Sequence, residues 1–233
     1  RRVLALGVLA HDVHVDLAGQ TVIPGEEVFR GPIGGQDARS APSLNRNGNF
    51  NDINVGKRGV SLNLASAKGK EIFKRIVAIS DVVMENYSAT AMDEMGLGYD
   101  VLRSINPDII YVQASGWGYT GPYRNYLSYG PTAQAISGLT FESGLPDREP
   151  AGWGFSYLDH HGGYFVALAT CMALMQKKRT GKGMHIDLAQ AATGFMLSGT
   201  AVLDHSANNR HFTRAGNRSP NRPAAPHGAY PTN

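Results

Sequence analysis

Three short stretches of the chain carry the residue pattern of β-strands. "RGVSLNL" at 58–64 alternates apolar and polar positions, whereas "DVVMEN" at 81–86 and "DIIYVQAS" at 108–115 contain short apolar runs rich in β-branched residues. Helical patterns separate these three stretches. The order strand, helix, strand, helix, strand over residues 60–115 therefore predicts an α/β fold with an open parallel sheet.

The helical patterns between these strands are short. "SAKGKEIFKRIVAIS" at 66–80 has Ser66 as a possible N-cap, and it places three isoleucines on one helical stripe: Ile72, Ile76 and Ile79. "TAMDEMGLGYDVLRSIN" at 90–106 predicts two short helices separated by glycines. Pro107 is expected to end the second of them.

The second half of the chain continues the same pattern. Residues 131–145 predict a helix of small residues followed by a loop, and Asp159–Lys178 predicts a long helix with apolar residues at Phe165, Leu168, Ala169, Met172 and Met175. "KKRTGKG" is a helix stop, since basic residues precede a glycine. A further strand is expected at 184–190 and a further apolar helix at 191–204.

The two ends of the chain are less regular. Residues 1–20 contain two short β-like runs, "VLALGVLA" and "VHVDLA", and residues 21–56 are rich in Gly, Pro, Asn and Ser, which predicts irregular loop. Residues 205–233 show no periodicity, and the chain stops there. We therefore expect a truncated chain whose regular part lies between these ends.

Composition narrows the range of functions. The chain has 233 residues, a formal net charge of +3 and scattered basic residues, which argues against a nucleic-acid partner. No apolar run has membrane-spanning length and no convincing leader is present, so we expect no membrane partner. The single cysteine, Cys171, excludes a disulfide framework, is expected to be a small buried residue, and fits a cytoplasmic location.

Candidate chemistry is concentrated in "YLDHHGG" at 157–163. Adjacent residues of a helix point about 100° apart, so Asp159, His160 and His161 cannot easily converge on one metal ion, and the i,i+4 pairing of helical metal sites is absent. Asp159 alone has two interpretations. It either caps the helix that follows or acts as a nucleophilic carboxylate in its first turn, where the helix dipole stabilises negative charge.

The order of motifs favours the nucleophile. "NVGKRGVSLNLASAKGKEIF", "SDVVMENYS", "MGLGYDVLRSINPDIIYVQASGWGYTGPY", "QAISGLT" and "YLDHHGGYFVALATCMALMQKKRTGKGMHIDLAQ" follow one another. Together they resemble the class III CoA-transferase family over residues 45 to about 200. The resemblance implies a Rossmann-like open parallel sheet with flanking helices. It also implies a large domain at 45–204, a divergent or irregular segment at 1–44, and the start of a linker to a second domain at 205–233.

The resemblance also implies a reaction. Asp159, Gly163 and "TGKG" at 180–183 match the family's D-x-x-x-G segment and the turn that ends its helix. Asp159 is then the nucleophile that attacks an acyl-CoA thioester, and CoA passes to a small carboxylic acid through an acyl-aspartyl anhydride and an aspartyl-CoA thioester. Gly163 is expected to allow a close approach near the thioester. CoA and acyl-CoA are substrates, no permanently bound cofactor or metal is implied, and relatives form interlocked homodimers.

The expected CoA contacts follow by position. They are Leu62, Asn63, Asn86, Tyr87, Ser88, Ser128 and Tyr129. Ala65 and Glu94 stand where relatives often have basic residues for the CoA phosphates, and Lys57 or Arg58 is expected to compensate.

Two alternatives to a transferase remain open. An α-methylacyl-CoA racemase needs a His/Asp acid–base pair on opposite faces of the substrate, but the position of the racemase histidine carries Tyr129. The high reference pKa of a tyrosine suits that proton transfer poorly. The other alternative is an inactive CoA-binding fragment.

Overall fold

A five-stranded sheet forms the centre of the molecule. The computed structural model describes residues 62–219 and 225–232, single residues at 55 and 60, and the backbone of two strands near the start of the chain. The strand order is β2-β1-β3-β4-β5, with β2 antiparallel to β1 and all other neighbours parallel. The bounds are β1 Ala5–Leu9, β2 Asp12–Asp16, β3 Val82–Glu85, β4 Ile110–Ser115 and β5 Met184–Ala189. The predicted α/β fold with an open parallel sheet is confirmed.

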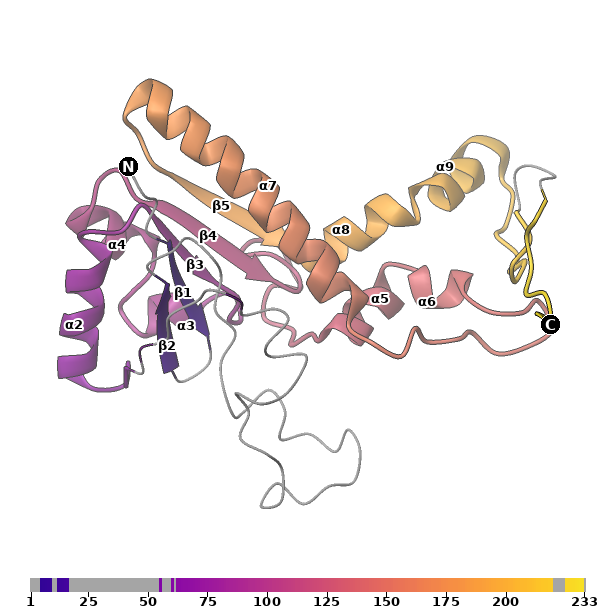
Figure 1. The fold of residues 1–233 in the computed structure, drawn as a ribbon, viewed down its shortest axis with the longest axis horizontal. Helices are drawn as coiled ribbons and strands as arrows, with labels where there is room; N and C mark the ends of the chain where they lie inside the picture. Colours follow the sequence, from indigo (N-terminus) through magenta and orange to yellow (C-terminus); the bar gives the residue numbers. More distant parts are fainter. Residues whose placement is uncertain are drawn as a thin grey trace, which may run out of the picture.

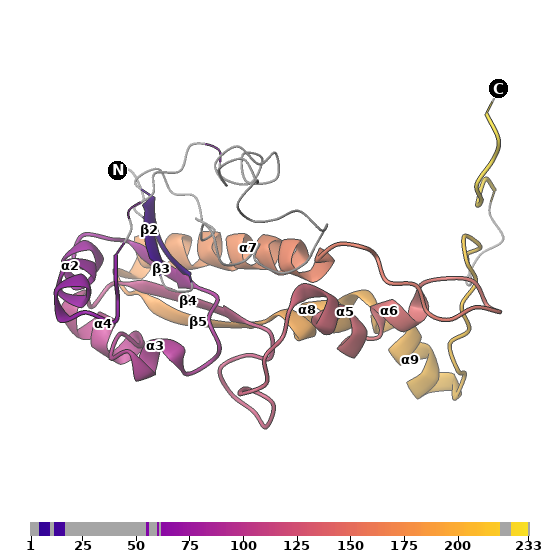
Figure 2. The same cartoon turned by 90° about the horizontal axis from the view of Figure 1, so that it is seen from below.

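Helices cover both faces of the sheet (Figures 1 and 2). One face carries three short helices, α2 (Ala67–Val77), α3 (Ala91–Glu94) and α4 (Tyr99–Ile105), and the other carries the long helix α7 (Tyr157–Thr180). Successive strand residues point to opposite faces. Val83 and Tyr111 therefore pack with α2, α3 and α4, whereas Val82, Ile110 and Val112 pack against Val166 and Ala173 of α7.

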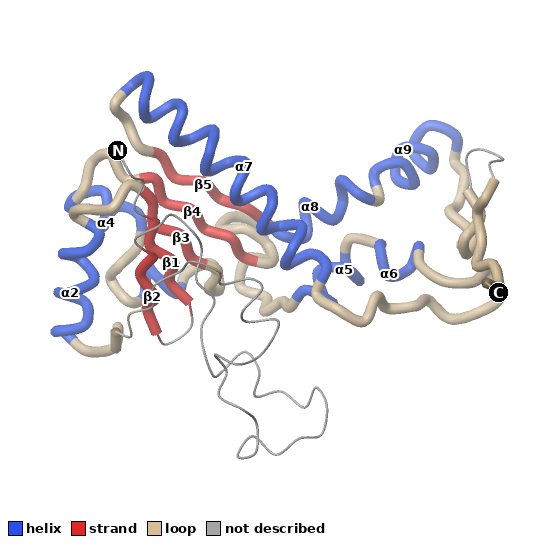
Figure 3. Tube along the Cα trace, viewed as in Figure 1, coloured by secondary structure: helices blue, strands red, loops and turns tan. Residues whose placement is uncertain are grey.

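A second group of helices lies beyond the carboxyl ends of β4 and β5 (Figure 3). It consists of α5 (Gly130–Ile136), α6 (Leu139–Glu142), α8 (Gln190–Leu197) and α9 (Gly199–Asn208). Both α5 and α8 pack against α7, and a small core of Ala133, Leu139 and Leu158 joins this group to the start of α7. This packing brings the first turn of α7 to the edge of the sheet where ligands bind in open α/β folds.

The predicted strand at 58–64 is wrong for the residues of that stretch that the structure describes. Residues 62–64 lead into a turn instead, in which Asn63 Oδ1 accepts a hydrogen bond from the Ala65 amide (2.9 Å) and the Asn63 carbonyl accepts one from the Ser66 amide (3.1 Å). An asparagine that bonds to the backbone in this way competes with strand pairing. The parallel neighbours of β3 are β4 and, on its other side, β1 from the start of the chain.

The N-cap of α2 is confirmed, but its buried stripe differs from the prediction. Ser66 Oγ accepts a hydrogen bond from the Gly69 amide (3.0 Å), as an N-cap does. Phe73 and Val77, one turn apart, are buried. Ile76 lies at the edge of this face, and Ile79 follows the helix with 72% of its surface exposed. The large aromatic side chain, rather than the run of isoleucines, sets the face that packs on the sheet.

The long helix shows a similar difference. It begins and ends close to the predicted residues, and Gly181 closes it in the left-handed conformation that a C-terminal glycine favours. However, its buried residues are Leu158, Gly162, Val166 and Ala173. Leu168, Met172, Met175 and the predicted buried Cys171 are exposed. Periodicity located the helix but not the face that contacts the sheet.

The predicted helix at 191–204 is divided in two at Ser198. The buried Ser198 hydroxyl donates a hydrogen bond to the Ser137 carbonyl at the end of α5 (2.6 Å). This contact fixes the chain between α8 and α9, and Gly199 follows directly. The other segments expected as strands or helices after residue 80 are present, with 131–145 divided between α5 and α6.

We expect Phe73→Ala to lower the free energy of unfolding by about 3–5 kcal/mol, because it removes a fully buried ring from the core. Ile79→Ala is the matched control and should cost no more than about 0.5 kcal/mol, since that side chain is mostly exposed. Urea unfolding followed by circular dichroism measures both values. Equal losses for the two variants would contradict the packing of α2.

Candidate active site

Asp159 lies in the first turn of α7, where its side chain is exposed and its backbone amide donates to the Ser156 carbonyl (3.1 Å). Its carboxylate is held from another element. Gln190 Nε2 donates a hydrogen bond to Asp159 Oδ1 at 3.0 Å. Gln190 is the first residue of α8 and directly follows β5, so the carboxyl end of the sheet positions this amide. The helix dipole of α7 favours a negative charge at the same place.

A glycine lies against the other carboxylate oxygen. Gly130 is the buried first residue of α5, and a Cβ atom at this position would lie 2.5 Å from Asp159 Oδ2 and 2.5 Å from Ser156 Cβ. Real Cβ atoms do not approach other atoms so closely. Any side chain at position 130 would therefore displace the carboxylate or the start of α7.

The two neighbouring glycines in "DHHGG" have different surroundings, and the close approach to a thioester that is expected of Gly163 stays a prediction. A Cβ atom on the exposed Gly163 would meet no atom within 4 Å among the described residues. Gly162 is buried instead, and its Cβ position lies 3.3 Å from Gln190 Cγ. The close approach in this motif is therefore between Gly162 and Gln190, the residue that holds Asp159.

The loop that follows β4 leads into Gly130 and so ends beside Asp159. The Gly116 carbonyl accepts a hydrogen bond from the Ala191 amide (3.0 Å), and Gly116 packs directly against the Ser128 side chain. Ser128 Oγ is buried and has no hydrogen-bond partner among the described residues. Tyr129, 77% exposed, is the next residue and precedes Gly130. Two predicted CoA contacts thus lie beside Asp159.

The other predicted CoA contacts form a second group at the end of β3. Asn86, Tyr87 and Ser88 make up the loop after this strand, and Leu62 and Tyr87 pack against the same core cluster. Asn63 is in the turn before α2. The predicted contacts thus come from two places along the carboxyl edge of the sheet. Lys57 and Arg58 lie outside the described residues.

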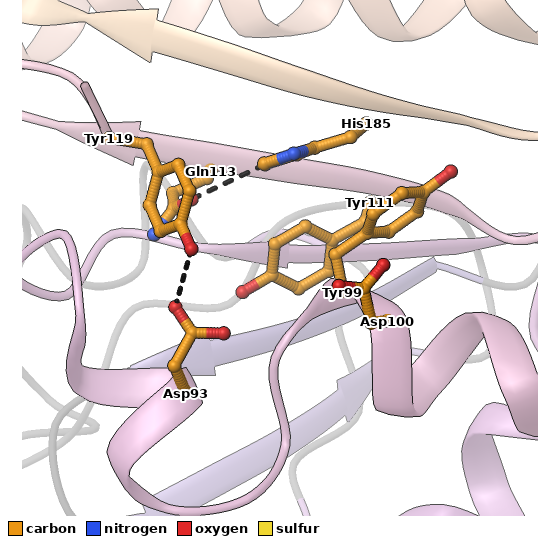
Figure 4. Close-up of a pocket in the computed structure, with 7 residues that line it drawn as sticks. All are labelled: Asp93, Tyr99, Asp100, Tyr111, Gln113, Tyr119 and His185. Atoms are coloured by element: carbon orange, nitrogen blue, oxygen red, sulfur yellow. Dashed lines mark hydrogen bonds between the residues drawn. The ribbon is translucent and has the colours of Figure 1, made fainter.

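Sequence reasoning missed a polar cavity of about 230 Å³ between the sheet and helices α3 and α4 (Figure 4). It is lined by Asp93, Tyr99, Asp100, Tyr111, Gln113, Tyr119 and His185. Tyr119 Oη donates to Asp93 Oδ2 (2.9 Å), and the Tyr119 amide donates to Asp187 Oδ1 (2.8 Å). The histidine ring packs on Tyr99, with 5.0 Å between ring centroids. A signal in the sequence was the polar residues Gln113 and His185 within otherwise apolar strands, whereas Asp93, Tyr99, Asp100 and Tyr119 come from helices and a loop.

A buried carboxyl group lies beside this cavity. Glu85, at the end of β3, is only 1% exposed, and burial raises its pKa from 4.5 to about 8. Hydrogen bonds from the Tyr87 amide and Tyr111 Oη oppose this shift in part, whereas the charge of Asp93 adds to it. Burial also raises the pKa of Tyr111 and lowers that of His185. Near neutral pH the Glu85 carboxyl is therefore mostly protonated and uncharged.

Residues 62–219 and the other described positions contain no group of three or more His, Cys, Asp or Glu side chains arranged to hold a metal ion. None of the helices in the described part of the chain is long and apolar enough to cross a bilayer.

The raised pKa of Glu85 predicts a pH-dependent stability. The folded state binds the proton more tightly than the unfolded chain, so the stabilisation is complete below about pH 4.5 and is lost as pH rises through about 8. Glu85→Gln mimics the neutral form and does not ionise. We therefore expect this variant to gain stability over the wild type, on the order of a few kcal/mol, between about pH 5 and about pH 8. Urea unfolding at both pH values measures the difference, and a pH-independent difference would contradict the assignment.

Comparison with known proteins places this arrangement in a family. The sequence profile of CoA-transferase family III matches residues 29–233. The acetyl-CoA:oxalate CoA-transferase of Acetobacter aceti is 37% identical over 172 residues, which are 73% of this chain and 44% of that protein. The succinyl-CoA–D-citramalate CoA-transferase of Chloroflexus aurantiacus is 33% identical over 176 residues, covering 76% of this chain and 43% of the relative.

A solved structure agrees with this. A CaiB/BaiF family protein from Brucella suis superimposes with a TM-score of 0.75 at 32% identity, covering 88% of this chain and 55% of that one. The chain thus spans less than half the length of the two curated relatives above. The profile match over most of the chain and the shared fold together show that the chain belongs to CoA-transferase family III.

Proposed function

We propose that the protein transfers CoA from an acyl-CoA donor to a carboxylic acid acceptor, with Asp159 as the nucleophile. The observation that supports this most strongly is the exposed Asp159 carboxylate in the first turn of α7, held by Gln190 on one oxygen and faced by a glycine on the other. A capping role is not seen among the described contacts, since the side chain of Asp159 accepts its hydrogen bond from a residue of α8 rather than from its own helix.

The chemistry follows from a carboxylate in this position. Asp159 attacks the thioester carbonyl, the C–S bond breaks, and CoA thiolate leaves an acyl-aspartyl anhydride. The thiolate then attacks the aspartyl carbonyl carbon. The donor acid leaves as a carboxylate, and an aspartyl-CoA thioester remains. An acceptor carboxylate reverses both steps and leaves as the new CoA ester. None of these steps is an oxidation or a reduction, and none needs a permanently bound cofactor.

The two oxygens of the Asp159 carboxylate have different neighbours. The Gln190 amide fixes Oδ1 and thereby orients the group, which lowers the entropic cost of reaching the attacking geometry. Oδ2 is the proposed attacking oxygen. It faces Gly130, and a side chain at position 130 would occupy the space that Oδ2 needs. Ser128 and Tyr129 directly precede Gly130 and are proposed to contact the acyl-CoA; the buried Ser128 hydroxyl has no hydrogen-bond partner among the described residues. Leu62, Asn63, Asn86, Tyr87 and Ser88 are proposed to contact the CoA portion.

The relatives support a small acid as acceptor, since those compared above are named for oxalate and citramalate. Three further expectations from the sequence belong to the same proposal. They are an interlocked homodimer, a cytoplasmic location, and the division into a segment at 1–44, a large domain at 45–204 and a linker from 205 onward.

Asp159→Asn tests the nucleophile, because the amide keeps the shape of the side chain but does not attack a thioester. In the full-length protein we expect the rate of CoA exchange between an acyl-CoA and a free acid to fall by about 10³-fold or more, with the free energy of unfolding little changed. Transfer at the wild-type rate would show that Asp159 is not the nucleophile. Deuterium incorporation at the α carbon, with no transfer, would instead favour a racemase.

Gly130→Ala tests the close approach to Asp159 Oδ2. The added methyl group displaces the carboxylate or the start of α7, so we expect the exchange rate to fall about 10- to 100-fold. Gly199→Ala is the matched control, since Gly199 is also the first residue of a helix, but a Cβ atom there would meet no atom within 4 Å among the described residues. Initial rates at saturating acyl-CoA compare the two variants. If Gly199→Ala is impaired as strongly as Gly130→Ala, the explanation by local space around Asp159 is wrong.

A further inference from the structure

Two buried polar side chains hold the loop that follows β3. Glu85 and Gln113 are each 1% exposed, although they lie in strands that are otherwise largely apolar. Placing a polar group in such a core is costly unless it is hydrogen-bonded, and an apolar residue of similar size is often as stable or more stable. Burial of both residues therefore calls for an explanation beyond the packing of the sheet.

The hydrogen bonds of these two residues provide that explanation. Glu85 Oε2 accepts from the Tyr87 amide at 2.7 Å, and Gln113 Nε2 donates to the Ala89 carbonyl at 2.7 Å. The two contacts fall on either side of Ser88. They tie the loop to β3 through Glu85 and to β4 through Gln113.

A further set of side chains fixes the two holding residues. Tyr111 Oη donates to Glu85 Oε1 at 3.3 Å. Gln113 Oε1 lies 3.3 Å from His185 Nε2 of β5, which fixes the orientation of the amide if the histidine carries its proton there. Three adjacent strands thus contribute to one polar network. Such networks specify a single conformation when every member is satisfied.

We propose that Glu85 and Gln113 are positioning residues that hold Asn86, Tyr87 and Ser88 in the conformation that binds CoA. The proposal rests on the proposed function, which assigns these three loop residues to CoA. Neither Glu85 nor Gln113 touches the substrate. They act through the loop backbone, and they do so from within the core of the sheet.

The uncharged form of Glu85 suits this role. A neutral carboxyl group accepts the hydrogen bond from the Tyr87 amide. It adds no negative charge beside Asp93, and none beneath the proposed site for the anionic CoA molecule. The titratable groups that act on it are Tyr111 from β4 and Asp93 from α3, with His185 of β5 one residue further along the network through Gln113. A glutamine at position 85 therefore preserves the holding contact, whereas leucine removes it.

The test compares CoA binding and loop protection in the full-length protein. Glu85→Leu and Gln113→Met each remove one contact to the loop, and we expect each to weaken CoA binding by about tenfold in calorimetry. We also expect faster hydrogen exchange of the Tyr87 amide in Glu85→Leu. Glu85→Gln should stay within about twofold of the wild type in both measurements. In kinetic assays the KM for acyl-CoA should rise while kcat changes little.

Leu102→Ala is the control for a general loss of stability. Leu102 is a fully buried residue of α4 and makes none of the hydrogen bonds that hold the loop, so its variant should bind CoA within about twofold of the wild type. Wild-type affinity in Glu85→Leu and Gln113→Met, or equal weakening in Leu102→Ala, would overturn the proposal. Calorimetry needs no turnover. A failure of Asp159 as nucleophile would therefore leave the binding result readable, and the two proposals fail separately.

Discussion

The hydrogen bond from Gln190 to Asp159 joins the start of α8 to the first turn of α7, where the reaction is proposed to occur. Asp159 belongs to the helix that covers one face of the sheet, and Gln190 follows the strand that forms the sheet edge. The contact requires α7 to begin beside the end of β5. In that arrangement Gly162 packs closely on the Gln190 side chain, where a Cβ atom would lie 3.3 Å from Gln190 Cγ, and Leu158 anchors the first turn in the small helical core.

Different strand ends along the carboxyl edge of the sheet supply the two halves of the proposed site. The ends of β4 and β5 supply the loop with Ser128 and the residue Gln190, which surround the proposed nucleophile. The end of β3 supplies the loop proposed to bind CoA, and its support lies inside the sheet, in Glu85 and Gln113. The proposed transfer of CoA between acids requires both a reacting carboxylate and a separate surface for the CoA portion, because only the thioester end of the substrate reacts.

Sequence reasoning succeeded where local patterns decide the structure. Short apolar runs with β-branched residues became β3 and β4, and the basic residues followed by Gly181 ended the long helix. It failed where tertiary contacts decide. Asn63 turned a strand-like stretch into a loop, and Phe73 rather than the isoleucines determined the buried face of α2. Asp159 was predicted as the nucleophile from its motif, and it stays a proposal. Gln190, Gly130 and Glu85 were missed, because only the fold shows that they lie beside Asp159 or beside the loop.

The central claim is a covalent bond to one side chain, and mass spectrometry of the trapped enzyme tests it directly. The full-length protein is incubated with an acyl-CoA, treated with hydroxylamine and digested with a protease. The account predicts a hydroxamate on Asp159 and on no other carboxylate, formed only when acyl-CoA is present, because hydroxylamine intercepts an aspartyl thioester. An unmodified Asp159 peptide from protein that is actively transferring CoA would contradict it.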